Sequence, residues 1–262
     1  MNEAEPAIPT AGGTDRWRLD GRIALVTGAS SGLGARFARV LHAAGAHVVV
    51  TARRAERLDE LARHGGNRIH TIAGDITDPQ HRLAVIEMLR PHGRLDVLVN
   101  NAGTCDTGSP LPQQSLDELQ RVVQVNLISV LDLCRLTADL LRAAPAGSVI
   151  NVASMYGIVA SRDPMAAYNA TKAALINLTR HLAAVWGRDG VRVNALAPGY
   201  FPTDLTGFLA DPAFAQSIRD HTLLGRTPQP DELDGPLLFL ATAASSYMTG
   251  QTLVIDGGWT AI

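Results

Sequence analysis

This sequence has few aromatic residues and few cysteines, and its positive and negative charges nearly balance. Aromatic residues make up 5% of the 262 residues, and the cysteines are Cys105 and Cys134. Two cysteines cannot form a disulfide framework, so we expect a reducing, cytoplasmic environment. Lys and Arg total 23 against 25 Asp and Glu, which gives a net charge of −2. Such a balance lacks the basic footprint of a nucleic-acid binder, and we expect no nucleic-acid partner.

Long apolar runs are also absent. None approaches the ~18 residues of a membrane span, so no membrane partner is expected. Residues 1–18 are acidic and rich in proline and glycine, without the apolar stretch of a secretion signal, and are expected to form a flexible tail. The remainder is apolar enough for a packed core, because 46% of all residues are hydrophobic. We therefore expect residues 19–262 to form one domain.

Short β-branched runs alternate with segments in which apolar residues recur every three or four positions. The runs are apolar on consecutive residues, which is typical of strands buried on both faces. The expected strands are Ile23–Thr27, Ala46–Thr51, Arg68–Ala73, Leu95–Asn100, Ser148–Val152, Val191–Ala197 and Thr252–Ile255. The expected helices are Leu33–Ala44, Leu58–Arg63, Pro79–Arg90, Leu116–Leu141 and Ala166–Trp186. This alternation predicts an α/β fold, a single doubly wound Rossmann-type domain with a seven-stranded parallel sheet.

One stretch, Gly199–Pro230, has no clear period and is longer than ordinary connections. It is either a substrate lid, which we place at residues 199–228, or an element that the pattern does not reveal. Bulky side chains in and near it favour an apolar-leaning substrate, although they would serve equally as packing of a lid. These residues are Met155, Tyr156, Phe201, Leu205, Phe208 and Leu209.

A glycine-rich turn follows the first strand and leads directly into a helix. It reads Thr27-Gly28-Ala29-Ser30-Ser31-Gly32-Leu33-Gly34. Glycines here allow a tight turn and let the backbone approach a pyrophosphate at the positive end of the helix. A glycine triad also occurs at ordinary strand–helix turns, but its place in the first βα unit favours a dinucleotide site. No Lys-Ser or Lys-Thr follows, which disfavours a P-loop nucleotidase.

The end of the second strand lacks the acidic residue that would bind the ribose hydroxyls of NAD. It reads Val50-Thr51-Ala52-Arg53-Arg54-Ala55-Glu56. A guanidinium can pair with a 2′-phosphate through its planar fork, whereas an acid would repel it. The two arginines therefore favour NADP, with NAD as the alternative, unless they merely begin a solvated helix.

Polar residues follow the fourth, fifth and sixth strands, at the edge where open parallel sheets bind ligands. They include Asn100–Gly103, Ser154 and Pro198-Gly199, while Tyr168 and Lys172 share one face of the next helix. We expect Lys172 to lower the pKa of Tyr168 so that the phenol can protonate a developing alkoxide. Ser154 would donate a hydrogen bond to the same oxygen. A Tyr-x3-Lys pair by itself is usually a chance pair, and the combination is what makes it specific.

Asn126, Cys105 and the histidines are also candidate functional residues. Asn126 interrupts an apolar stripe, so it either ties down backbone, which periodicity favours, or holds a water near the chemistry. Cys105 is either a reactive thiol or, as we favour, a small buried hydrophobe. The eight histidines show no paired ligand spacing, so no metal is expected.

Over about residues 20–260 these features resemble the short-chain dehydrogenase/reductase family. The matching residues are Thr27–Gly34, Asp75, Asn100–Gly103, Asn126, Ser154, Tyr168, Lys172, Pro198-Gly199 and Thr203. The resemblance implies an NADP-preferring oxidoreductase that moves hydride between NADP(H) and a carbonyl or secondary alcohol of 3-oxoacyl, keto or sugar-acid-like type. Together with the long apolar helices, it also implies a homotetramer.

The resemblance assigns a role to each catalytic residue. Tyr168 would be the acid/base, Lys172 would bind the nicotinamide ribose, Ser154 would polarise the substrate oxygen, and Asn126 would hold a relay water. The implied cofactor contacts are Gly28, Ser30, Ser31, Gly32, Leu33, Gly34, Arg53, Asp75, Ile76, Asn101, Ala102, Gly103, Tyr168, Lys172, Pro198, Gly199 and Thr203. The plainer alternatives are a helix cap for Asp75 and a turn residue for Thr203.

The chain departs from the family pattern in the spacing of its catalytic residues. Thirteen residues separate Ser154 from Tyr168, one more than expected, and a one-residue insertion at Ser161–Pro164 would absorb the difference. Tyr156 is not the catalytic tyrosine, because Ala160 stands where its lysine would be. Two other functions remain open: an NAD-preferring alcohol or sugar-acid dehydrogenase, and a catalytically idle dinucleotide-binding regulator, which would not need the catalytic residues.

Overall fold

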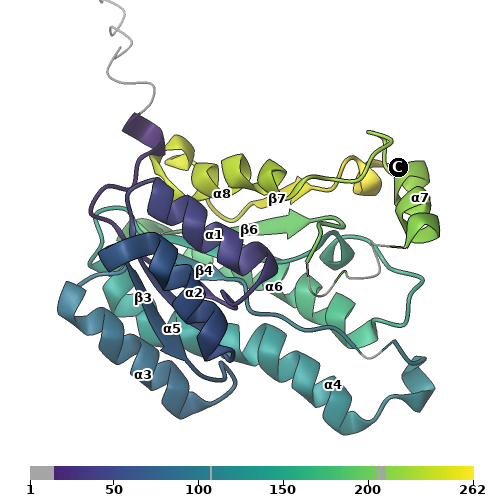
Figure 1. Cartoon of the computed structure of the whole chain (residues 1–262), viewed down its shortest axis with the longest axis horizontal. Coiled ribbons are helices and arrows are strands. Elements are labelled where there is room, and N and C mark those ends of the chain that lie inside the picture. The colour runs from purple at the N-terminus through teal and green to yellow at the C-terminus, as the bar shows by residue number, and fades with distance from the viewer. Residues whose placement is uncertain (1–14, 107, 204–205, 207–210) are drawn as a thin grey trace, which may run out of the picture.

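The computed structural model describes residues 15–106, 108–203, 206 and 211–262. Seven strands form one sheet in the order β3-β2-β1-β4-β5-β6-β7, with every neighbouring pair parallel. Helices cover both faces of this sheet (Figure 1). The predicted fold class, a single doubly wound domain with a seven-stranded parallel sheet, is therefore confirmed.

The strands lie where the β-branched runs predicted them. They are β1 Ile23–Thr27, β2 His47–Ala52, β3 Ile69–Ala73, β4 Val97–Asn100, β5 Ser148–Val152, β6 Arg192–Pro198 and β7 Thr252–Ile255. β1, β5 and β7 have the expected bounds, and the others differ by one or two residues at an end. Because β1 and β4 are neighbours at the centre of the sheet, the turns that follow them meet at its carboxyl edge.

The helices depart from expectation in three places. They are α1 Gly32–Ala43, α2 Ala55–Gly65, α3 Pro79–Leu89, α4 Leu116–Val123, α5 Ser129–Arg142, α6 Ala166–Trp186, α7 Pro212–His221 and α8 Asp234–Ala241. α7 lies inside the stretch that showed no clear period, and α8 was not expected either. The predicted helix Leu116–Leu141 is interrupted by a π-turn at Gln124–Ile128, so α4 and α5 are distinct helices.

The π-turn explains why the apolar stripe of the predicted long helix does not face the core throughout. Val130 and Leu133 are buried, but Leu116 at the start of α4 is 67% exposed. A π-turn adds a residue to one helical turn and rotates the faces on its two sides relative to each other. Asn126 lies within it and is fully buried.

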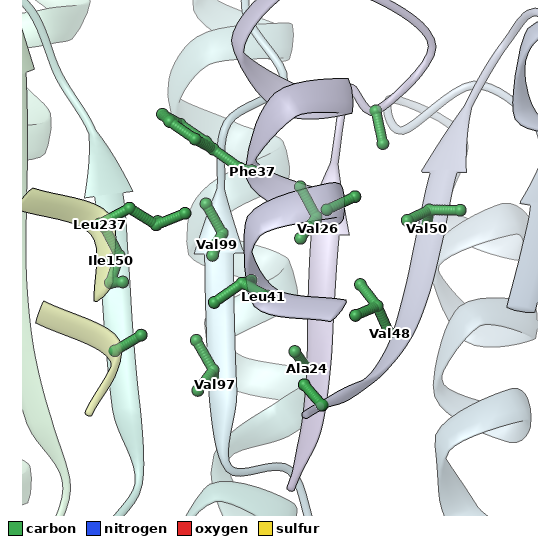
Figure 2. Close-up of a cluster of buried hydrophobic side chains, with 14 of the residues drawn as sticks. Ala24, Val26, Phe37, Leu41, Val48, Val50, Val97, Val99, Ile150 and Leu237 are labelled. Atoms are coloured by element: carbon green, nitrogen blue, oxygen red, sulfur yellow. The ribbon is translucent and has the colours of Figure 1, made fainter. Parts of the chain in front are cut away.

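The core is divided between the two faces of the sheet. Ala24 and Val26 of β1 face one cluster, which includes Phe37 and Leu41 of α1, as Figure 2 shows. Leu25 points to the opposite cluster, which α3, α5 and α6 cover. Burial on both faces is what the consecutive apolar residues predicted, and it leaves the carboxyl ends of the strands for a ligand.

The start of the described chain contacts the domain. Asp15–Trp17 forms a 3-10 turn, and the ring centroids of Trp17 and Phe239 are 6.3 Å apart. The predicted tail boundary at residue 18 stays a prediction, since residues 1–14 lie outside the described part. None of the described helices combines the length and apolar character that crossing a membrane requires.

Candidate active site

Backbone conformation and close packing require glycine in the turn between β1 and α1. Gly28 and Gly32 have φ of +69° and +52°, a region that glycine occupies without steric cost. A Cβ on Gly28 would lie 2.8 Å from Ala102 Cα, and one on Gly34 would collide with the carbonyl oxygen of Gly28. The side chain of Ser31, the N-cap of α1, makes no capping hydrogen bond. The backbone N–H groups of this helix end can therefore serve an anionic ligand.

Thr27 joins the glycine turn to the loop that follows β4. Its hydroxyl accepts hydrogen bonds of 3.0 Å from the backbone N–H groups of Asn101 and Ala102. The Asn101 side-chain amide donates to the Thr27 carbonyl at 2.9 Å. A Cβ on Gly103 would lie 3.6 Å from both Asn126 Oδ1 and Lys172 Nζ. The loop therefore bridges the glycine turn and the residues predicted to be catalytic.

Two guanidiniums and two hydroxyls gather where β2 ends. Arg54 donates through Nη2 to Ser30 Oγ at 3.0 Å and also to Ser31 Oγ. Arg53 is exposed, and its charge contributes to lowering the pKa of the Asp75 carboxyl. The result is a polar, positively charged group of side chains beside the glycine turn.

Asp75 is held in a turn at the end of β3. Its Oδ1 accepts hydrogen bonds from the backbone N–H and the hydroxyl of Thr77, at 2.9 and 2.8 Å. Burial opposes ionisation of Asp75, but these hydrogen bonds and the charge of Arg53 outweigh it, so its pKa is lowered overall. The following carbonyl, of Ile76, accepts from Arg82 at 2.7 Å. Asp75 caps this local turn, whereas α3 is capped by Asp78.

The catalytic residues named by the sequence converge at the end of β5 and the start of α6. The Ser154 hydroxyl lies close enough to Tyr168 to lower the pKa of its phenol in part, so the longer spacing between them does not separate them. Lys172 lies one turn further along α6, with Nζ 5.5 Å from the centroid of the Tyr168 ring. Its ammonium donates to the Val152 carbonyl at 2.7 Å.

The electrostatics of this pair differ from the prediction. Burial raises the pKa of Tyr168 well above its ordinary value, although the hydrogen bond with Ser154 lowers it in part. Burial lowers the pKa of Lys172 to about 8. The expectation that Lys172 lowers the pKa of Tyr168 is therefore wrong for this structure, because desolvation dominates and the ammonium is directed to Val152. At neutral pH the phenol is protonated.

Asn126 has its hydrogen-bonding capacity satisfied by the protein. Its Oδ1 accepts from the backbone N–H of Thr104 at 2.9 Å, and its Nδ2 donates to the Thr104 carbonyl at 2.9 Å and to Thr171 Oγ1 at 3.1 Å. These contacts fit the structural role that periodicity favoured, tying the loop after β4 to α6. A relay water held by Asn126 stays a prediction.

The segment after β6 returns to the glycine turn. Pro198 ends β6 and is paired with Ile255 of β7. A Cβ on Gly199 would lie 2.9 Å from Asp256 Cα, so only glycine fits there without a shift. Thr203 lies against Gly32, since a Cβ on that glycine would be 3.2 Å from the Thr203 Cβ. The segment after β6 and the glycine turn, which both belong to the predicted cofactor site, are therefore in contact.

Comparison with known proteins identifies the family. A family model described as enoyl-(acyl carrier protein) reductase matches residues 28–260. The chain belongs to the short-chain dehydrogenase/reductase family. A gluconate 5-dehydrogenase from Gluconobacter oxydans is 38% identical over 252 residues, which cover 94% of this chain and 97% of that protein.

Two solved structures of the short-chain dehydrogenase/reductase family have similar folds. A gluconate 5-dehydrogenase from Burkholderia cenocepacia, in complex with NADP and tartrate, is 39% identical with a TM-score of 0.88, covering 95% of this chain and 98% of that one. A 7α-hydroxysteroid dehydrogenase in complex with NADH and 7-oxo glycochenodeoxycholic acid is 31% identical, also with a TM-score of 0.88, and covers 94% and 97%.

Sequence analysis missed Asp106, whose buried carboxylate accepts hydrogen bonds from the backbone N–H groups of Tyr168 and Ala167, at 2.9 and 3.3 Å. These residues are 62 and 61 positions away in the chain. The only signal available was negative: Met165, at the start of α6, is a residue that cannot cap a helix.

Aromatic side chains form the wall beyond Ser154. The hydroxyls of Tyr156 and Tyr200 are 2.7 Å apart, and the Tyr200 ring centroid is 5.4 Å from those of Phe214 and Trp259. A small, partly open cavity of about 70 Å³ lies beside them. Met155, Phe201, Ile218 and Leu224 are among its other lining residues. Leu205, Phe208 and Leu209, which were also expected at the pocket, lie outside the described residues.

The thiol and the histidines add no chemistry of their own. Burial raises the pKa of the Cys105 thiol, which disfavours a reactive thiolate and fits the favoured interpretation of a small apolar side chain. In the described part of the chain, no three His, Cys, Asp or Glu side chains gather as a metal would need. The site therefore depends on hydroxyl, amide and ammonium groups.

Proposed function

We propose that this chain is an NADP(H)-dependent oxidoreductase that interconverts a carbonyl compound and a secondary alcohol, with Tyr168 as the proton donor in reduction. The observation that carries the proposal is the buried ammonium of Lys172, 5.5 Å from the centroid of the Tyr168 ring, with the Ser154 hydroxyl close to the same phenol. A regulator that only binds a dinucleotide would not need these three groups together.

The proposed chemistry assigns each group a task. When bound, the nicotinamide supplies the hydride in reduction and accepts it in oxidation. Negative charge then develops on the substrate oxygen, where the Ser154 hydroxyl donates a hydrogen bond and the Tyr168 phenol donates the proton. Because the raised pKa keeps Tyr168 protonated at neutral pH, the donor form is present before the reaction. Lys172 would hold the nicotinamide ribose through its ammonium.

The residues around the glycine turn fit a dinucleotide. The uncapped start of α1 can bind a pyrophosphate, and we assign Asp75 and Ile76 to the adenine side. Arg53 and Arg54, with Ser30 and Ser31, supply the positive charge and donors that a 2′-phosphate needs. This arrangement favours NADP over NAD.

The cavity that is lined by Met155, the residue after Ser154, favours a substrate with an apolar portion. Its lining is largely aliphatic and aromatic, and such walls bind apolar surface while a few polar groups fix the reacting end. A keto, 3-oxoacyl or sugar-acid-like compound could present its carbonyl to Tyr168 and Ser154. Residues 199–228, which contain α7, would close over it as a lid.

We also propose a cytoplasmic homotetramer. Leu116 of α4, Leu131 of α5 and Val185 of α6 are exposed apolar residues, and contact between subunits would cover them. Both cysteines are free thiols, as a reducing compartment requires. Light scattering checks the assembly, and a particle of 27.8 kDa at micromolar concentration would contradict it.

The proposal is tested with a panel of ketones and alcohols, each assayed with both cofactors by absorbance of the reduced nicotinamide. We expect turnover of at least one carbonyl compound, with a higher kcat/KM for NADPH than for NADH. The reverse preference would support the NAD-dependent alternative. Binding of NADPH without turnover of any compound would support the regulator.

A further inference from the structure

Helix α6, which carries Tyr168 and Lys172, begins without a capping side chain of its own. Its N-cap residue, Met165, makes no side-chain hydrogen bond. The first helical hydrogen bond is donated by Asn169 to the Met165 carbonyl at 2.9 Å. The N–H groups of the preceding residues, including Ala167 and Tyr168, therefore need acceptors from outside the helix.

Asp106 supplies those acceptors from the loop that follows β4. Its Oδ2 accepts from Tyr168 at 2.9 Å, and its Oδ1 accepts from Ala167 at 3.3 Å. These are the second and third positions of α6, the ones that an N-cap side chain normally satisfies. The carboxylate is 9% exposed, and it places negative charge at the positively polarised end of the helix.

The position of Asp106 is itself fixed by neighbouring residues. The preceding Thr104 is bonded through its N–H and its carbonyl to the buried Asn126. Arg121 of α4 donates to the Thr104 hydroxyl at 2.9 Å and to the Cys105 carbonyl at 3.3 Å. Asp106 therefore extends from a braced loop, and the first turn of α6 is held against that loop.

We propose that Asp106 is the positioning residue of Tyr168: its carboxylate fixes the first turn of α6 so that the phenol is directed to Ser154. This inference rests on the proposed role of Tyr168 as proton donor. Lys172 has a separate anchor, its hydrogen bond to the Val152 carbonyl. Loss of Asp106 should therefore affect proton transfer far more than binding of the cofactor.

The test compares Asp106→Ala, which removes both acceptor oxygens, with Asp106→Asn, which keeps one of them. The control is Asp78→Ala, because Asp78 caps α3 in the same manner by accepting from the Gln80 N–H at 2.8 Å. For each protein we would measure kcat, KM, the Kd of NADPH and the pH dependence of kcat. Hydrogen exchange of the Ala167 and Tyr168 amides would be measured in parallel.

For Asp106→Ala we expect kcat to fall about 10- to 100-fold, the scale of a misplaced catalytic group, with the Kd of NADPH changed by less than about threefold. Asp106→Asn should recover most of kcat, because its remaining amide oxygen can still accept a hydrogen bond from the first turn of α6. Asp78→Ala should keep its kcat. Exchange of the two amides should be faster only in the Asp106 variants.

Three results would overturn the inference: an unchanged kcat in Asp106→Ala, equal losses of kcat in Asp106→Asn and Asp106→Ala, or unchanged exchange of the two amides. If the wild type turned over no substrate, the proposed function would fail. Amide exchange, which needs no substrate, would still decide whether Asp106 holds the first turn of α6.

Discussion

Two buried charged residues, Asp96 and Lys172, lie at opposite ends of the sheet and have different partners. At the amino end, Asp96 accepts from Arg22 at 2.8 Å, from Arg94 at 3.0 Å and from the Ile23 N–H at 2.9 Å. At the carboxyl end, Lys172 is 4% exposed and donates to the Val152 carbonyl. Among the described residues no carboxylate forms an ion pair with this lysine, whereas the buried Asp96 has two cationic partners.

This difference separates a charge that stabilises the fold from one that is kept for chemistry. A buried ion with its partners in place is neutral or modestly stabilising, but a buried ion without a counter-charge costs free energy. The lowered pKa of Lys172, about 8, is the sign of that cost. Groups of this kind gather at functional sites, where the charge acts on a ligand. The two ends should therefore respond to mutation in opposite ways.

Replacement of Lys172 by Met should give the largest effect on activity. The variant removes the ammonium but keeps an apolar chain of similar length, so kcat should fall about 10²–10³-fold and NADPH should bind more weakly. Because the uncompensated charge is gone, the free energy of unfolding should be equal to or greater than that of the wild type. Steady-state kinetics and denaturant unfolding measure both. A variant that is much less stable than the wild type and still active would contradict both expectations.

Replacement of Asp96 by Ala should give the converse result. It leaves Arg22 and Arg94 without their buried partner, and breaking such a pair typically costs about 3 kcal/mol of unfolding free energy. Because the residue lies at the far end of the sheet from Tyr168, kcat at a temperature where the variant is folded should be unchanged. Urea denaturation and the same kinetic assay test this. A loss of kcat as large as that of Lys172→Met would show that the two ends are not separable.

Replacement of Arg53 by Ala should discriminate between the cofactors. The loss of one charge-assisted contact to a 2′-phosphate should raise the KM for NADPH about tenfold, equivalent to about 1.4 kcal/mol. The KM for NADH, which has no such phosphate, should hardly change. Arg57→Ala is the matched control, since Arg57 is exposed on α2 and pairs with Glu60. Equal increases in the KM for NADPH and for NADH would contradict the assignment of Arg53 to the 2′-phosphate.

The smallest predicted effect concerns pH and stability. Lys172 has a pKa of about 8 in the folded protein, below its ordinary 10.5, so the unfolded chain binds more protons between these values. Its destabilising contribution is fully present below pH 8 and is relieved as the pH rises toward 10.5. From pH 7 to pH 9 the wild type should gain about 1 kcal/mol of unfolding free energy relative to Lys172→Met. A constant difference across this range would contradict the perturbed pKa.

The glycine turn and the strands could be predicted because their determinants are adjacent in the chain. Thr27, Gly28 and Gly34 belong to one βα unit, and burial of both sheet faces leaves consecutive apolar residues. The interruption of the helix after α4 was hidden, since a π-turn leaves the three- and four-residue spacing of apolar residues almost unchanged. α7 was missed because it lies in the stretch that shows no clear apolar period, and α8 because its sequence, DGPLLFLA, lacks a polar face.

The sequence predicts which residues belong to the candidate site but not the contacts among them. Tyr168, Lys172 and Ser154 could be named from their spacing and chemistry. The contact of Asp106 with Tyr168 spans 62 residues, and no local pattern records a contact between such distant segments. The pKa of Tyr168 was predicted in the wrong direction because the sequence shows the neighbouring ammonium but not the depth of burial.

The central claim, that Tyr168 donates the proton, is tested most directly by Tyr168→Phe. This variant keeps the ring and removes only the hydroxyl, so the Kd of NADPH, measured by fluorescence titration, should match that of the wild type. With the best carbonyl substrate of the panel, kcat should fall by about 10²–10⁴-fold, the usual contribution of general acid catalysis. A folded variant that binds NADPH and retains near-normal kcat would contradict the account.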